Sequence, residues 1–282
     1  MIEQLWLNHY VMPKLRVSAI SFLNTAPLMW EFEHGGLGRE YAVEYTLPSQ
    51  CAELLRTDGA DIGIIPAAAY ADIPELMVIP DIAIAARGPV RSIFLISKVP
   101  VENIRTVAAD TSSRSSVVLL RVLFSKFWGG NPEFVAMAPV LEPMLAQCDA
   151  GLLIGDPALL ARTKAGSFHV FDLAEEWKNF TGKDFVFAFW AVRKGALAGV
   201  DTWKLVRDFQ LSRDHGLEPA NLETIAEEWS GRIGLSREEI INYLAEAIYY
   251  KLDEGCLEGL RLFYQYASEC GALPQAPGLE FV

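Results

Sequence analysis

Short apolar runs alternate with helix-like stretches through the first two thirds of the chain. The runs between residues 15 and 193 are rich in Val, Ile, Leu and Phe, and most are followed by residues with helical spacing. This alternation is typical of a largely parallel sheet covered by helices, so it predicts an α/β fold. The predicted strands cover residues 15–20, 41–47, 61–65, 93–97, 106–109, 134–138, 151–154, 169–171 and 185–192. The predicted helices begin near Thr25, Ser49, Ser115, Leu141, Pro157 and Leu173.

The pattern changes after residue 199, where strand signals almost disappear. The remaining residues predict three or four amphipathic helices. The best marked begins at Ser236, which has capping-box spacing to Glu239 ahead of an apolar stripe. A helical tail of this length needs a surface to bury against, and the economical arrangement returns it to the first part of the fold.

The length of the chain favours two lobes, because a single hydrophobic core stops growing before 282 residues are reached. We predict a discontinuous first lobe of residues 14–95 plus 195–282 and an inserted second lobe of residues 96–194. The chain would cross between them near residues 92–98 and 192–195. Residues 1–13 precede the fold and are expected to be an N-terminal extension.

Composition and charge exclude several classes of function. Apolar residues make up 51% of the chain and no apolar run is long enough to span a bilayer, so we predict a globular protein. The N-terminal residues lack the pattern of a signal peptide, which predicts a cytoplasmic location. A net charge of −12 without a basic stripe argues against nucleic acid or an anionic membrane as partner. The four cysteines have neither metal-ligand spacing nor disulfide density, and no metal or cofactor motif occurs.

Polar residues gather where predicted strands give way to helices, which is the edge where α/β sheets bind ligands. In the segment from Ser21 to Leu28, the Asn24 amide and the Thr25 hydroxyl could bind an anion, or one of them could simply cap the helix. Ser92 follows a strand that breaks at Gly88-Pro89 and resumes. A serine in a strand is usually structural, and no histidine nearby in sequence supports a nucleophilic role.

Two further strand ends carry candidate binding groups. The hydroxyl-rich segment 110–117 leads into an apolar helix, whose free N–H groups and dipole would attract a carboxylate, although the same residues could form an ordinary serine cap. Arg114 within it is either a binding group or a solvated side chain. The segment 151–158 ends a buried strand in Gly-Asp-Pro, where the glycine allows a ligand close to the backbone and the aspartate could equally cap a helix. The candidate residues are Thr111, Ser112, Ser115, Ser116, Ile154, Gly155 and Asp156.

The order of these motifs resembles the chorismate dehydratase family of the futalosine route to menaquinone. The resemblance covers most of residues 15–195, and the combination of motifs is specific although each alone is weak. It implies a fold like the type II periplasmic binding proteins, with two α/β lobes, a central cleft and a two-strand hinge. The matching segments are residues 21–28, 61–70, 88–92, 112–117, 153–159 and 185–192.

The resemblance also implies an activity, the removal of water from chorismate to give 3-[(1-carboxyvinyl)oxy]benzoate. Formation of an aromatic ring makes the reaction downhill, so the protein needs mainly to orient the substrate and stabilise developing charge. We expect the enolpyruvyl carboxylate of the substrate to remove the ring proton while Asn24 and Ser92 assist catalysis. The other candidate residues, with Ser21 and Phe185, would line the substrate site.

Two alternatives remain open. The synthase that makes dihydroxynaphthoate later in the same pathway shares this fold, but it is expected to use a histidine base in the second lobe, where Gly155 and Asp156 stand here. A non-catalytic intracellular small-acid binding protein is the other alternative, because a fold does not fix a function.

Overall fold

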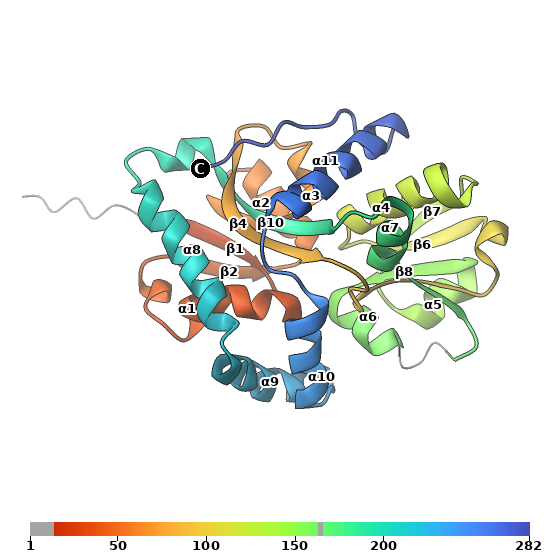
Figure 1. Ribbon diagram of the computed structural model, residues 1–282, viewed down its shortest axis with the longest axis horizontal. Helices are drawn as coiled ribbons and strands as arrows, with labels where there is room; N and C mark the ends of the chain where they lie inside the picture. The colour runs from red at the N-terminus through yellow and green to blue at the C-terminus, as the bar shows by residue number, and fades with distance from the viewer. Residues whose placement is uncertain (1–13, 163–165) are drawn as a thin grey trace, which may run out of the picture.

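Two five-stranded sheets, each at the centre of a lobe, make up the computed structural model of the protein (Figure 1). The structure describes residues 14–162 and 166–282, so the predicted extension lies outside the described residues. The strands are β1 (Arg16–Ile20), β2 (Ala42–Thr46), β3 (Ile62–Pro66), β4 (Leu76–Ala86), β5 (Ile93–Ser97), β6 (Thr106–Asp110), β7 (Glu133–Met137), β8 (Ala150–Ile154), β9 (His169–Asp172) and β10 (Phe185–Arg193).

Each sheet contains one strand that runs against its neighbours. The first sheet has the order β2-β1-β3-β10-β4, in which β10 is antiparallel to β3 and β4. The second has the order β7-β6-β8-β5-β9, in which β5 is antiparallel to β8 and β9. Both antiparallel strands are buried along almost their whole length, because helices cover both faces of such sheets.

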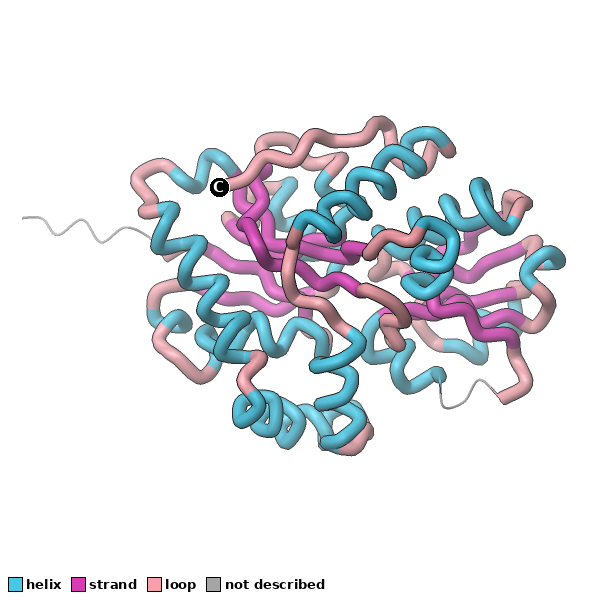
Figure 2. Tube along the Cα trace, in the orientation of Figure 1, coloured by secondary structure: helices cyan, strands magenta, loops and turns pink. Residues whose placement is uncertain are grey.

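Helices surround the two sheets (Figure 2), and all the helices and turns after β10 belong to the C-terminal part of the chain. The α-helices are α1 (Trp30–Glu33), α2 (Pro48–Arg56), α3 (Ala67–Tyr70), α4 (Ser115–Leu123), α5 (Leu141–Gln147), α6 (Gly155–Arg162), α7 (Leu173–Thr181), α8 (Thr202–Gly216), α9 (Pro219–Ile233), α10 (Arg237–Asn242) and α11 (Glu254–Glu269). Short 3₁₀ turns cover Leu23–Met29 (η1), Leu37–Arg39 (η2), Val101–Asn103 (η3) and Lys194–Leu197 (η5), and π turns cover Phe124–Trp128 (η4) and Tyr243–Ala247 (η6).

Strand pairing corrects both predicted lobe boundaries, since β5 begins at Ile93 in the second sheet although residues up to 95 were predicted for the first lobe. The prediction placed residues 185–192 in the second lobe, whereas β10 lies in the first sheet between β3 and β4. A continuous apolar run indicates a strand buried on both faces but does not say which sheet contains it. The chain therefore crosses between the sheets at residues 87–92, ahead of β5, and at residues 182–184, ahead of β10, rather than near residues 92–98 and 192–195.

The C-terminal helices return to the first lobe, as their apolar stripes predicted. Helix α8 packs against η1 and β4, and α11 packs against β10 and also reaches α4 of the second lobe (Figure 1). The packing of α8 is close, since a Cβ at Gly216 would lie 1.9 Å from the carbonyl oxygen of Pro27. The capping box of α10 is confirmed, with the Glu239 N–H donating to Ser236 Oγ over 3.2 Å. Across residues 14–162 and 166–282, no helix combines the length and apolar character needed to cross a bilayer.

Candidate functional site

A cavity lies where the carboxyl ends of strands from both sheets meet. Strands β1, β3 and β8 end at this cavity, as expected for an open α/β fold. Most of its wall is apolar, and the polar groups come from Asn24 on one side and from residues 113–116 on the other. The lining residues are Ile20, Phe22, Asn24, Pro48, Pro66, Ile84, Ile93, Ser113, Arg114, Ser115, Ser116, Ile154, Gly155, Phe187 and Ala188.

Asn24 is the polar residue that the first lobe contributes to the cavity. It lies in η1, whose N-terminus has no side-chain cap, so the capping alternative for Asn24 and Thr25 does not apply. The backbone carbonyl of Asn24 accepts a hydrogen bond from the Tyr250 hydroxyl over 3.0 Å. Thr25 is buried outside the cavity, and exposed Ser21 donates to the Thr46 carbonyl over 3.4 Å. Of the three candidates in this segment, the structure brings only Asn24 to the cavity.

Ser92 is fully buried at the end of the first crossing between the lobes. The carboxylate of Asp172 accepts the N–H groups of Val90 and Arg91, over 3.2 and 2.7 Å, and so fixes the turn before Ser92. The Ser92 hydroxyl accepts a hydrogen bond from the Tyr243 hydroxyl over 2.8 Å. Ser92 does not line the cavity, so its predicted catalytic role could only be exercised through its neighbours.

The loop after β6 divides its hydroxyl groups between the cavity and its own lobe. Ser116 is buried and lines the cavity. The exposed residue Thr111 donates its N–H to the Met137 carbonyl, and Ser112 donates its hydroxyl to Asp110 Oδ1 over 2.7 Å. Consecutive residues of a turn face different directions, which puts Thr111 and Ser112 outside the cavity, contrary to our expectation.

Ser115 joins the two lobes at the edge of the cavity. Its hydroxyl accepts the Ala68 N–H over 3.1 Å and donates to the Phe187 carbonyl over 2.9 Å. Both partners belong to the first lobe, whereas Ser115 begins α4 of the second. Because its single hydrogen is already donated, Ser115 contributes to lobe contact and wall shape rather than a free donor.

Ser113 and Arg114 are cavity residues that sequence reasoning did not place. Ser113 Oγ is buried and has no hydrogen-bond partner among the described residues. Arg114 is half-buried and lies 3.8 Å from a carboxylate oxygen of Asp72, a long ion pair near the surface. No side chain caps α4, whose first N–H groups have no partner within the helix, and α4 begins at the cavity residues Ser115 and Ser116. The only sequence feature that could have placed Ser113 and Arg114 at the cavity is their position within the hydroxyl-rich segment 110–117.

Gly155 brings the second lobe into contact with η1. Its φ of +59° is in the left-handed region, and its N–H donates to the Ser92 carbonyl over 2.8 Å. A Cβ at this position would lie 2.6 Å from the ring of Phe22, so only glycine allows the present approach. Ile154 and Gly155 both line the cavity, and their binding of substrate stays a prediction.

Asp156 bridges the lobes instead of lining this cavity. Its Oδ1 accepts the Leu23 N–H over 3.0 Å, which joins α6 to η1. Burial disfavours the charged form and raises the pKa of Asp156 to about 6, and the hydrogen bond from Leu23 offsets only part of this rise. The Asp156 carboxylate therefore joins the two lobes through Leu23, but burial of its negative charge lowers the stability of the fold.

Replacing Asp156 with asparagine should change how stability depends on pH. The folded-state pKa is raised, so the carboxyl group stabilises the fold fully below about pH 4 and this contribution is lost as pH rises through about 6. Asparagine does not titrate and keeps an oxygen for Leu23. We expect Asp156→Asn to gain about 2–3 kcal/mol over the parent above pH 7 and much less at pH 4, measured by chemical denaturation. Asp149→Asn is the control, because N–H groups lower the pKa of Asp149. Its substitution should therefore reduce the free energy of unfolding at neutral pH instead of increasing it. Equal gains at pH 4 and 8 would contradict this account.

Phe185 belongs to the core and not to the cavity, which corrects its predicted place. Its ring packs against Trp177 and Phe263, with ring centroids 5.5 and 5.0 Å apart. The pairing of β10 with β4 is irregular between Val186 and Ala188, and Phe187 and Ala188 line the cavity instead. An irregularity in strand pairing leaves no mark in an unbroken apolar run.

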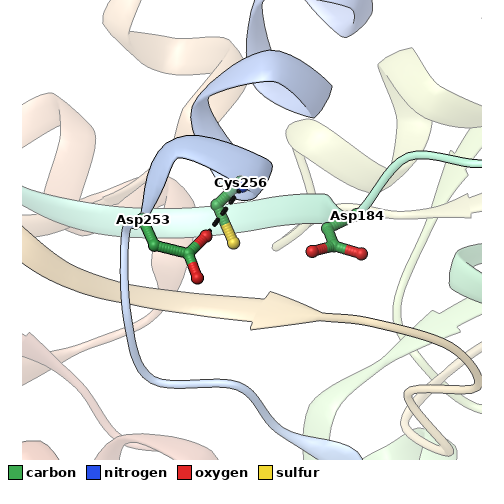
Figure 3. A group of neighbouring side chains, drawn as sticks. All are labelled: Asp184, Asp253 and Cys256. Atoms are coloured by element: carbon green, nitrogen blue, oxygen red, sulfur yellow. Dashed lines mark hydrogen bonds between the residues drawn. The ribbon is translucent and has the colours of Figure 1, made fainter.

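A second group of polar side chains lies at the second crossing, where Asp184, Asp253 and Cys256 come within 4.8 Å of one another (Figure 3). Arg87 pairs with both carboxylates, over 2.5 Å to Asp253 and 3.5 Å to Asp184. Lys178 also pairs with Asp184, over 2.8 Å. Burial raises the pKa of the Cys256 thiol to about 12, which opposes formation of a thiolate. Arg87 and Lys178 neutralise the two carboxylates, so the group is an ion-pair network. It joins both crossings between the lobes to the start of α11.

The fold and the sequence both have relatives. A family model described as menaquinone biosynthesis matches residues 15–269. A protein from Thermus thermophilus named chorismate dehydratase is 29% identical over 273 residues, covering 91% of this chain and 94% of the relative. A crystal structure from Archaeoglobus fulgidus superposes with a TM-score of 0.73 at 17% identity, covering 92% of this chain and 98% of that one.

Solved binding proteins share the architecture. The periplasmic aliphatic sulphonate binding protein of Escherichia coli has a TM-score of 0.64 at 18% identity, covering 94% of this chain and 95% of that one. A Candida albicans protein described as having the generic periplasmic binding protein fold has a TM-score of 0.63 at 13% identity. The match covers 94% of this chain and 92% of that one. These likenesses confirm the predicted periplasmic-binding-protein-like fold. Because the family model covers almost the whole chain, this protein belongs to the menaquinone biosynthesis family.

Proposed function

We propose that the protein is a carbon–oxygen lyase of the cytoplasm that removes water from chorismate and releases 3-[(1-carboxyvinyl)oxy]benzoate. The observation that carries the proposal is the cavity, in which an amide from one lobe faces Arg114 and an uncapped helix start from the other. The similarity to a named chorismate dehydratase across 91% of the chain supports the same assignment.

The cavity offers local positive potential in a protein of net charge −12. Arg114 and the N-terminus of α4 attract a carboxylate, and Ser113 and Ser116 supply hydroxyl groups beside them. Chorismate carries two carboxylates and a ring hydroxyl. The cationic end of the cavity suits a carboxylate, and the apolar wall suits the carbon ring. The ring lies against the apolar residues between the lobes.

Within the part of the chain that the structure describes, the residues that line the cavity include no Asp, Glu, His, Lys or Cys. A proton acceptor must therefore come from the substrate, and the enolpyruvyl carboxylate is the suitable group. It takes the ring proton, the electron pair left behind forms the new ring double bond, and the carbon–oxygen bond to the hydroxyl breaks. The departing hydroxide takes up the proton that the enolpyruvyl carboxyl group had removed from the ring and leaves as water, while Asn24 donates an amide hydrogen bond to the oxygen on which charge develops.

An assay with chorismate tests the proposal. Purified protein is mixed with chorismate, and ultraviolet absorbance and mass spectrometry follow formation of the aromatic product and loss of water. Binding without conversion would identify a non-catalytic binding protein. No reaction with chorismate, together with turnover of cyclic dehypoxanthine futalosine, would select the dihydroxynaphthoate synthase. That synthase is disfavoured because no histidine within the described residues lines the cavity.

Arg114→Gln tests the source of positive charge. A hydrogen bond to a charged group contributes about 1.5–3 kcal/mol, so we expect KM for chorismate to rise about ten- to hundredfold. The effect on kcat should be smaller, because the carboxylate is bound before and during the reaction. Arg121→Gln is the matched control, since Arg121 lies exposed on the same helix outside the cavity. Equal KM values for both variants would remove Arg114 from the binding site.

A further inference from the structure

A single buried carboxylate, that of Asp172, joins the end of β9 to the first crossing between the lobes. Its side chain is 6% exposed. Its Oδ1 accepts the N–H groups of Ala174 and Glu175, over 3.0 and 3.3 Å, and so caps α7. The same oxygen accepts the Val90 N–H, and Oδ2 accepts the Arg91 N–H over 2.7 Å. Three of these four bonds share one oxygen, and within the described residues Oδ2 serves the crossing alone.

The N–H group bound by Oδ2 belongs to a residue whose backbone is strained. Arg91 has a φ of +61°, in the left-handed region that a residue with a Cβ rarely adopts. The side chain contributes little to this conformation, because it is 42% exposed and its ion pair with Glu246 spans 3.7 Å. A glycine would adopt the same φ without strain. The Asp172 carboxylate is therefore the group that holds the backbone of Arg91 in place.

The position of Ser92 and of part of the cavity wall depends on this turn. The carbonyl of Ser92 accepts the Gly155 N–H over 2.8 Å, and its hydroxyl accepts the Tyr243 hydroxyl over 2.8 Å. Gly155 lines the cavity, and so does Ile93, the residue that begins β5 directly after Ser92. A change of φ at Arg91 would therefore move the cavity wall on the side of the second lobe.

We propose that Asp172 is a positioning residue, which holds Arg91 in the left-handed conformation and thereby fixes Ser92 and the cavity wall at Gly155 for the reaction. The inference rests on the proposed function and extends it to a residue outside the cavity. It also gives Ser92 a role consistent with its burial, because the Ser92 carbonyl holds Gly155 in the wall. A residue that only capped α7 would need Oδ1 and leave Oδ2 without a function.

Asp172→Asn removes the bond to Arg91 and keeps the helix cap. An asparagine oxygen in the place of Oδ1 still accepts three N–H groups, whereas the amide nitrogen in the place of Oδ2 is a donor and cannot accept from Arg91. We expect kcat for chorismate to fall about ten- to hundredfold while KM changes less than about threefold, because orientation matters most in the transition state. Asp201→Asn is the matched control and should keep kcat, since exposed Asp201 caps α8 through the Lys204 N–H. Equal kcat values for the two variants would overturn the proposal.

A second substitution separates positioning from a general loss of structure. If Asp172 opposes backbone strain, Arg91→Gly should raise kcat about five- to thirtyfold in the Asp172→Asn background, since the left-handed conformation is disfavoured by about that factor for a residue with a Cβ. Arg91→Ala removes the same side chain but keeps the strain, so it should not restore kcat. Rescue by both substitutions, or by neither, would contradict the inference. Thermal unfolding of each variant accompanies the kinetics.

Hydrogen exchange keeps the proposal testable apart from the activity. The Gly155 N–H is bound by the Ser92 carbonyl, so peptides that contain Gly155 should exchange faster in Asp172→Asn than in Asp201→Asn, and Arg91→Gly should restore slow exchange. Unchanged exchange at Gly155 in Asp172→Asn would overturn the positioning role. If exchange changes as expected and the unmodified protein does not convert chorismate, the proposed function fails while the positioning of the turn stands.

Discussion

Asn24→Ala is expected to lower the turnover of chorismate at least a hundredfold, the largest effect we predict for a single side chain. Removal of one preorganised donor to developing charge typically costs a factor of about 10² to 10³ in kcat. Asn24 is the only amide side chain among the lining residues that the structure describes. Its loss should change kcat more than KM, because the developing charge exists only in the transition state.

The fold should survive this substitution, since Asn24 does not cap η1 and its backbone bond with Tyr250 remains. Steady-state kinetics and thermal unfolding of the same preparation check both expectations. Asn103→Ala, at an exposed position outside the cavity, provides the control. Turnover within about threefold of the parent, with an unchanged melting temperature, would show that Asn24 has no catalytic role.

Gly155→Ala is expected to reduce kcat/KM about a hundredfold by keeping the lobes apart. The new Cβ would meet the Phe22 ring at 2.6 Å, and the two residues belong to different lobes. Moving the lobes apart relieves this clash but separates Asn24 from Arg114 across the cavity. Misplacement of about 1 Å can by itself cost a factor of about 10² in rate.

Gly234→Ala is the matched control for backbone strain. Gly234 has a φ of +70°, and an added Cβ there has no atom within 4 Å. Both variants should therefore lose about 1–2 kcal/mol of stability through the left-handed conformation, but only Gly155→Ala should lose activity and show a larger radius of gyration in solution scattering. Identical activity and scattering in the two variants would refute the role of close lobe approach.

The strands could be predicted from the sequence because each needs only local information. Nine predicted strands coincide with observed ones to within two residues at each end. The tenth, β4, is the strand that was expected to break at Gly88, and it begins as early as Leu76. Partnership between strands is not local. An apolar run such as β10 suits any position at the centre of a sheet, so its place between β3 and β4 could not be predicted from the sequence.

The lining of the cavity could be predicted where candidate residues follow the ends of strands. Asn24, Ser116 and Gly155 follow directly from the positions at which strands stop, and all three line the cavity. Arg114 was left open because the turn around it sets its direction. The contact of Tyr243 with Ser92 was missed because the two residues are 151 positions apart and Tyr243 resembles an ordinary core tyrosine on an apolar helix face.

The return of the C-terminal helices to the first lobe has a consequence for how the protein is made. A ribosome releases β1 and η1 long before Tyr250, whose hydroxyl group donates a hydrogen bond to the Asn24 carbonyl. The inserted second sheet is complete by residue 172 and can fold while the rest is still being synthesised. The first lobe must wait with exposed apolar strands until its last helices emerge. Nascent chains that stall before residue 250 should therefore be inactive and should depend on chaperones that shield those strands.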